Sequence, residues 1–368
     1  MIFSIITNLV NLLQIYLLVF SAKLKKRKII FFYYPNKQLR LSHNFYIEYI
    51  FKNYSSEEYC IIYGHQEATR LGEYYFNIRQ SYLKFLTGID FFISNNICDV
   101  FPKKATKIFI HHNLYDDPWV RRDKEREMCQ RLIKYDYILV ATKATLIRAN
   151  ETFLRYNFIN KPKVVEVGYP KLDYLLLNLR NKKIKKKYIL IAPTLVNGFL
   201  DLSIVSKLKK IIKELLSNTD CDIVLRPHPR DRQLKSYLFL KDKFSKNQRF
   251  HYDLSDNYFD IYTKSKLMIT DFSGTAYTFA FLSLSPVIFY SINEKKIEEN
   301  EYSNYNFFLD REKIGHVVSN ESYMIDKIKL ILKNSNLYEK NIIKLRKNMK
   351  CLNRSTVEIR NFIKKITR

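Results

Sequence analysis

The sequence lacks the patterns that mark disulfide-rich or metal-binding proteins. Its five cysteines are scattered and include no CxxC pair: Cys60, Cys98, Cys129, Cys221 and Cys351. This spacing argues against a zinc site or a disulfide framework and is typical of a protein in a reducing cytoplasm. No cluster of acidic residues suitable for a metal is evident either. We therefore expect no required cofactor, although Mg²⁺ bound together with a donor is compatible with the sequence.

Acidic residues are also few relative to basic ones. The 368 residues include 63 Lys and Arg but only 36 Asp and Glu, which gives a formal net charge of +27. Such a surplus favours anionic partners, which are phosphates, lipid head groups or nucleic acid. We expect no nucleic-acid partner, because the charge is spread through the chain and no DNA- or RNA-binding motif is present. The apolar content of 47% is sufficient for packed cores, and the length is sufficient for two domains.

Residues 1–20 carry no charge at all and are followed by a basic cluster from Lys23 to Lys28. No basic residue precedes the apolar run, which argues against a cleaved signal peptide. The polar residues of this segment recur at helical spacing along one narrow stripe: Ser4, Thr7, Asn8, Asn11 and Gln14.

Three interpretations of this segment are open. Residues 1–22 are an amphipathic helix lying on a membrane that contains anionic lipids, a single membrane span, or an ordinary helix packed on the protein. The polar stripe favours the first interpretation. It predicts a peripheral or monotopic protein at the cytoplasmic face of the bacterial cell membrane.

Downstream, short apolar runs alternate with helical patterns, without internal repeats or low-complexity linkers. The runs predict strands at 29–34, 59–63, 91–93, 107–110, 137–140, 164–167, 188–191, 223–225, 267–269 and 287–290. Two successive series of this kind predict an α/β protein with two Rossmann-like, doubly wound domains that face a cleft. We place the domains at 23–180 and 181–335, with the charged stretch 181–187 at the boundary and basic helices at 336–368.

Two histidines follow the predicted strand 107–110. His111 or His112 at a strand end is suited to act as a general base, because the imidazole pKa lies near cellular pH. Asp116 and Asp117 follow within a turn and are placed to orient the ring. The alternative is that the histidine pair is only a surface or capping feature.

A second motif, from Arg226 to Arg230, follows the strand 223–225 and reads Arg-Pro-His-Pro-Arg. The two prolines restrict the backbone around His228. Arginine forms forked hydrogen bonds to phosphate, and His228 can donate to or protonate a leaving oxygen. We predict a diphosphate-binding loop, the alternative being a solvated basic loop.

A third motif spans 270–275, between the strand 267–269 and a helix predicted at 276–284. Asp271 and Ser273 are candidate N-caps of this helix. Ser273, Gly274 and Thr275 offer hydroxyls and close backbone approach at a helix N-terminus, where anions bind. The Ala192-Pro193-Thr194 exit of another strand is a weaker fourth candidate.

Five segments in order along the chain resemble those of the CDP-glycerol glycerophosphotransferase family, the primases and polymerases of teichoic-acid-like polymers. They are 168–173 (GYPKLD, similar to G-x-P-R-N-D), 188–194 (YILIAPT), 226–229 (RPHP), 269–274 (ITDFSG, similar to I-T-D-Y-S-S) and 286–290 (PVIFY). The His111-His112 loop looks like the family's H-G element, which bears the base.

The resemblance implies a glycosyltransferase-B-like (GT-B-like) fold and a transferase of the cell envelope. The C-terminal domain would hold a CDP-alditol donor, such as CDP-glycerol, and the N-terminal domain a lipid-linked or glycan acceptor. The base carries over to His112, or to His111 if the loop registers differently. His228 would serve the leaving phosphate. The remaining donor contacts carry over to Thr194, Arg226, Arg230, Asp271, Ser273, Gly274 and Thr275.

The chain also departs from the family pattern. Gly274 replaces a serine, Asn113 a glycine, and Tyr277, Thr278 and Phe279 stand where an acidic residue is expected. A carboxylate at this place commonly holds a ribose or an alcohol group in such folds. An alternative function is therefore a GT-B glycosyltransferase that uses a nucleotide sugar in capsule or other surface-polysaccharide synthesis.

Overall fold

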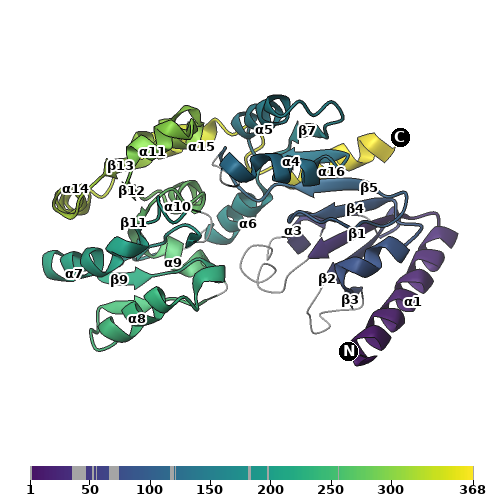
Figure 1. Ribbon diagram of the computed structural model, residues 1–368, viewed down its shortest axis with the longest axis horizontal. Helices are drawn as coiled ribbons and strands as arrows, with labels where there is room; N and C mark the ends of the chain where they lie inside the picture. Colours follow the sequence, from purple (N-terminus) through teal and green to yellow (C-terminus); the bar gives the residue numbers. More distant parts are fainter. Residues whose placement is uncertain are drawn as a thin grey trace. The chain divides into compact units, whose positions relative to one another are not determined.

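The computed structural model describes residues 2–34, 47–51, 54, 56–65, 74–116, 120, 122–180, 184–196, 199–255 and 257–367. The chain forms two compact α/β units (Figure 1). The first comprises residues 1–112, 124–171 and 354–368, and the second 113–123 and 172–353. The structure therefore divides the chain at 171/172, whereas we predicted 180/181. It also assigns the end of the predicted basic tail to the first unit.

The first unit is built on a seven-stranded parallel sheet of order β3-β2-β1-β4-β5-β6-β7. Its strands are β1 (Lys28–Tyr34), β2 (Tyr59–His65), β3 (Tyr75–Asn77), β4 (Phe91–Ser94), β5 (Thr106–Ile110), β6 (Tyr137–Val140) and β7 (Lys163–Glu166). Its helices are α1 (Ile2–Leu24), α3 (Ile47–Phe51), α4 (Glu125–Leu132), α5 (Lys143–Arg155) and α16 (Ser355–Thr367). β1 is buried along nearly its whole length, as its continuous apolar sequence predicts.

The second unit repeats this design on a six-stranded parallel sheet of order β10-β9-β8-β11-β12-β13. Its strands are β8 (Tyr188–Ile191), β9 (Asp222–Leu225), β10 (Phe250–Tyr252), β11 (Ser265–Thr270), β12 (Val287–Tyr290) and β13 (Gly315–Val318). Its longer helices are α6 (Pro170–Leu179), α7 (Leu208–Asn218), α8 (Lys235–Phe244), α10 (Thr275–Ser283), α14 (Glu321–Lys333) and α15 (Glu339–Lys347). Short helices complete it: α9 (Phe259–Thr263), α11 (Glu294–Glu299), α12 (Asn306–Leu309) and α13 (Arg311–Ile314).

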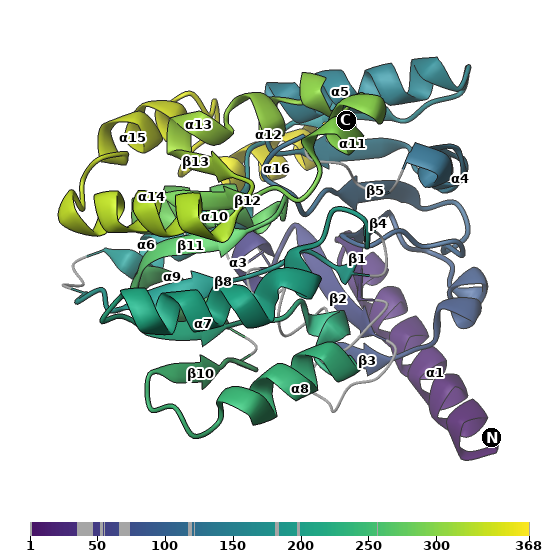
Figure 2. The ribbon, with the colours of Figure 1, turned by 60° about the vertical axis from the view of Figure 1, so that its left-hand side comes forward.

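Alternate residues of each buried strand face opposite sides of this sheet. Ile189, Ile223 and Ile269 join one core with Ile211 of α7 and Ile328 of α14. Figure 2 shows α7 and α14 side by side on that side of the sheet. In each sheet the first strand along the chain, β1 or β8, lies in the interior, and later strands are added on both sides of it. This is the doubly wound arrangement predicted from the alternating pattern.

Helix α1 packs on the first sheet through one face. Leu12, Ile15 and Val19 join the core formed by β1 and its neighbours. Two residues of the polar stripe are on this inner side, because the Asn8 Oδ1 accepts the Arg79 N–H at 2.9 Å and the Asn11 Nδ2 donates to the Asn77 carbonyl at 2.6 Å, whereas Gln14 is exposed. Asn8 and Asn11 therefore attach the helix to the protein, as the third interpretation predicts.

Large apolar side chains dominate the outer face of α1, which also carries the exposed Gln14 and Ser21. Its exposed large side chains are Ile5, Ile6, Leu9, Val10, Leu13, Tyr16, Leu17, Phe20 and Leu24. Residues 5–24 have a mean hydropathy of 1.8, and by length and composition this segment could cross a membrane. At its C-terminal end Lys25 and Lys26 are exposed, and Lys23 pairs with Asp90 at 2.7 Å.

Candidate active site

The second sheet has its topological switch point between β8 and β11. In an open parallel sheet, ligands bind outside the carboxyl ends of the strands at this point. The loops that leave β8, β9 and β11 meet at this edge because these strands are neighbours. They contain all the predicted donor residues: Thr194, Arg226, His228, Arg230, Asp271, Ser273, Gly274 and Thr275.

Asp271 connects the β11 exit to the loop after β8. Its Oδ1 accepts the N–H of Thr194 at 2.9 Å, and its Oδ2 accepts the N–H of Ile204 at 3.2 Å. The Thr270 hydroxyl adds a bond of 2.7 Å to the Ala192 carbonyl. Burial of Asp271 raises its pKa to about 6, against the opposing effect of the backbone donors. This carboxylate therefore fixes the shape of the loop around Thr194.

The turn after Asp271 leads into α10. Gly274 is the N-cap, without a side-chain acceptor, so the prediction that Asp271 or Ser273 caps the helix is wrong. The reason is that the Asp271 side chain is engaged by backbone groups outside the helix. Ser273, Gly274 and Thr275 are partly exposed, whereas α10 is buried from Ala276 onward. The Thr275 hydroxyl forms a hydrogen bond with that of Tyr262.

The two arginines of the Arg-Pro-His-Pro-Arg loop have different environments. Arg226 is buried and forms an ion pair with Asp253, with a further bond of 3.0 Å to the Ser255 hydroxyl. It thus holds the β9 exit to the β10 exit. Arg230, by contrast, is exposed. A phosphate contact of Arg226 stays a prediction.

His228 lies between these arginines and is partly exposed. Its Nδ1 accepts the Arg230 N–H at 3.3 Å. In a neutral imidazole one nitrogen is a donor when the other is an acceptor, so this bond assigns the proton to Nε2. The ring is therefore oriented to donate a hydrogen bond from Nε2.

In the first unit, His111 and His112 follow β5 directly, as predicted. The His111 side chain is buried against Phe109, while His112 is partly exposed. The His112 Nδ1 lies 3.2 Å from the Asn95 carbonyl, which can only accept, so Nδ1 carries the proton and Nε2 is the unprotonated nitrogen. The Tyr169 hydroxyl donates to the His112 carbonyl at 2.7 Å and so fixes the backbone at this residue. This geometry favours His112 over His111 as a base.

Asp116 does not orient a histidine. Its carboxylate accepts the N–H groups of Asn306 at 2.9 Å and of Phe307 at 2.8 Å, at the start of α12. The segment 113–123 belongs to the second unit, which accounts for this partner. Asp117 lies outside the described residues.

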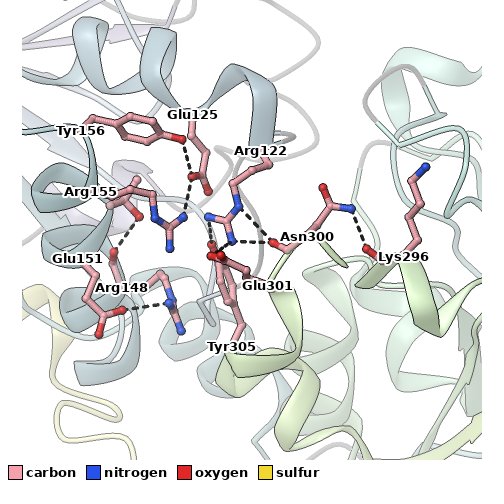
Figure 3. Close-up of polar contacts among 11 residues, drawn as sticks. Arg122, Glu125, Arg148, Glu151, Arg155, Tyr156, Lys296, Asn300, Glu301 and Tyr305 are labelled. Carbon is pink, nitrogen blue, oxygen red and sulfur yellow. Dashed lines mark hydrogen bonds and ion pairs between the residues drawn. The ribbon is translucent and has the colours of Figure 1, made fainter. Parts of the chain in front are cut away.

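Two other residues of the segment 113–123, Tyr115 and Arg122, also contact the second unit. Tyr115 stacks on Tyr277 with ring centroids 3.9 Å apart. Arg122 donates to the Asn300 carbonyl from Nε and Nη2, at 3.1 and 2.7 Å (Figure 3). Helices α10 and α12 and the residue after α11 thus hold this short segment, and all of these partners are far along the chain.

Sequence reasoning missed several residues of the second unit that support the site. Asp253 escaped notice because the preceding β10 has only three residues. Tyr262 lies on α9, a helix too short to show an amphipathic period. Among the described residues, no group of three or more His, Cys, Asp and Glu side chains is arranged to hold a metal ion.

Comparisons with known proteins agree with the motif series. The family model for CDP-glycerol:poly(glycerophosphate) glycerophosphotransferase matches residues 14–357. No curated protein sequence matches the chain.

Solved structures share the fold at low sequence identity. The wall teichoic acid polymerase TagF, as a histidine-to-alanine variant, is 18% identical with a TM-score of 0.63, over 92% of this chain and 89% of that one. A second TagF variant with CDPG is 17% identical with a TM-score of 0.62, over 100% of both chains. UDP-GlcNAc 2-epimerase from Methanocaldococcus jannaschii is 15% identical with a TM-score of 0.59, over 92% of this chain and 99% of that one.

These structures show a GT-B-like fold, and the family match spans nearly the whole chain. The chain is an enzyme that belongs to the CDP-glycerol:poly(glycerophosphate) glycerophosphotransferase family.

Proposed function

We propose that this enzyme transfers glycerol phosphate, or a related alditol phosphate, from a CDP-linked donor to a surface-glycan or teichoic-acid-like acceptor. The observation that carries the proposal is the set of three loops at the switch point of the second sheet. They bring His228, Ser273 and Gly274 to one edge, and the family match extends across all three. The TagF structure with CDPG supports the same donor class.

Each loop has a chemical part in donor binding. The partly exposed turn at Ser273 and Gly274 offers hydroxyl and backbone donors at the start of α10, where the helix dipole favours an anion. His228 donates from Nε2, and the exposed Arg230 adds positive charge. These groups neutralise a diphosphate without a metal, so we propose that no metal is required, which is compatible with Mg²⁺ bound together with the donor.

His112 acts as the general base in this proposal. Its Nε2 takes the proton from an acceptor hydroxyl, whose oxygen forms a bond to the β-phosphorus of the donor. The bond between that phosphorus and the bridging oxygen breaks, and CMP leaves with the electron pair. A hydrogen bond from the His228 Nε2 to a phosphate oxygen stabilises the charge that develops on the leaving group.

The test is CMP release from CDP-glycerol in the presence of a lipid-linked or glycan acceptor. We expect release by the wild type and its loss in His228→Ala. Arg232→Ala, a change on the same segment outside the predicted contacts, serves as the matched control. Thermal shifts with CDP-glycerol and with nucleotide sugars separate the two donor classes, because only a ligand that binds the folded state stabilises it. Stabilisation by a nucleotide sugar alone would contradict the proposal and favour the glycosyltransferase.

We further propose that the protein works at the cytoplasmic face of the bacterial membrane, with α1 lying in the lipid interface. Large apolar side chains dominate the outer face of α1, and the exposed Lys25 and Lys26 follow at its end. Lipid burial of such a face and attraction of lysines to anionic head groups are the two contributions that bind a monotopic helix. The bonds of Asn8 and Asn11 to the sheet support the interfacial arrangement over a span, because a span would have to break them.

A further inference from the structure

A second buried carboxylate holds the same loop as Asp271. Asp231 ends a short 3-10 helix, Pro229–Asp231, that begins within the Arg-Pro-His-Pro-Arg loop, and its side chain is wholly buried. Its Oδ2 accepts the N–H of Val196 at 2.7 Å, while its Oδ1 has no hydrogen-bond partner among the described residues. A buried carboxylate with a single bond costs free energy, so its presence needs an explanation.

Asp231 and Asp271 approach the loop after β8 from opposite sides. Asp231 follows β9 and Asp271 follows β11, and β8 lies between these two strands. Their backbone partners, Val196 and Thr194, are two residues apart in the same loop. Burial raises the pKa of the Tyr237 hydroxyl, and the charges of Asp271 and Asp231 raise it further.

We propose that Asp231 and Asp271 form a two-sided clamp on residues 192–196, in which Asp231 is a positioning residue for donor binding. Asp231 acts through the Val196 N–H and so fixes the backbone that carries Thr194. The clamp also joins the three loops of the candidate site to one another through buried bonds. The identity of the donor rests on the proposed function, whereas the clamp itself is a property of the second unit.

The clamp orders the loop at 192–196 before the donor binds. Fixing the backbone of a residue costs conformational entropy. A loop that is already fixed in the free enzyme does not subtract this cost from the donor affinity. Loss of the clamp should therefore raise the KM for the donor and change kcat at saturating donor much less.

The experiment compares Asp231→Leu, which has no acceptor, with Asp231→Asn, which keeps one acceptor oxygen. Hydrogen exchange of the amides at 194–196 is measured by mass spectrometry, together with the KM for CDP-glycerol. The matched control is Thr219→Val, which removes a buried hydrogen bond at the other end of the strands. We expect exchange at Val196 and the donor KM to rise about tenfold in Asp231→Leu, the size of one lost hydrogen bond. Asp231→Asn and the control should stay within about threefold of the wild type.

Unchanged exchange at 194–196 in folded Asp231→Leu would overturn the clamp, whatever the donor proves to be. Faster exchange without activity on CDP-glycerol in the wild type would uphold the clamp and contradict the proposed function instead. Val196→Pro removes the donor N–H and leaves the carboxylate in place, so it should raise exchange at Thr194 as well. The proposal assigns Asp231 a role confined to the loop at 192–196. Failure of both variants to fold would therefore also count against it, because Asp231 would then be needed for the whole fold.

Discussion

The outer face of α1 gives the sharpest test of membrane binding. Leu13, Leu17 and Phe20 lie on this face with 61%, 61% and 65% of their surfaces exposed. Full burial of such a side chain contributes about 1.5–3 kcal/mol, so burying the exposed part in lipid is worth about 1–2 kcal/mol for each residue. Replacing all three with Gln should remove about 3–6 kcal/mol, which is roughly 10²–10⁴ in the vesicle partition coefficient.

The assay is flotation with vesicles that contain anionic lipid, at fixed salt. Gln is a good helix former, and the inward residues Leu12, Ile15 and Val19 stay in place, so the fold should be kept. A matched control replaces Leu154, Phe239 and Leu309 with Gln, since these are exposed to a similar degree on other elements. Vesicle binding that survives the α1 changes, or falls equally in the control, would refute the reasoning.

Three other predictions concern the two units. His112→Ala should lower turnover by about 10² or more in the CMP-release assay, the usual effect of a lost general base, and a larger loss in His111→Ala would reverse the assignment. Arg226→Met should lower the free energy of unfolding in urea by about 3–5 kcal/mol, because it leaves the buried Asp253 without its ion-pair partner. A decrease in the free energy of unfolding below about 1 kcal/mol would contradict this prediction, because it would mean that water solvates the Asp253 carboxylate in place of the guanidinium. For Asp271, burial raises the folded-state pKa from 3.8 to about 6, which favours the protonated form in the fold. Its contribution to stability is therefore present below pH 3.8 and is lost as the pH rises through about 6, by about 3 kcal/mol. Urea titrations of the wild type and Asp271→Asn should differ in pH slope in this range, and parallel slopes would contradict the assignment.

Much of the fold was predictable because its strands are buried on both faces. A strand such as β8, Tyr188–Ile191, is a continuous apolar run followed by a loop, and local sequence suffices to locate it. The three missed strands, β3, β10 and β13, lie at the edges of their sheets. Edge strands have fewer buried neighbours, so the apolar signal there is short or absent. The order of the motifs along the chain was likewise enough to predict the family.

Other properties depend on contacts between residues far apart in the sequence. The polar stripe of α1 is visible in the sequence, but only packing on the sheet shows that Asn8 and Asn11 face inward and that large apolar side chains dominate the outer face. The carboxylates of Asp116 and Asp231 resemble surface loop residues until the fold brings Phe307 and Val196 to them. Sequence by itself determined the elements, the doubly wound class and the loops that carry chemistry, because these follow from local patterns of burial and turn formation. Tertiary structure alone decided which partner each buried polar group has, because such a group is stabilised by whichever donor the completed fold places beside it.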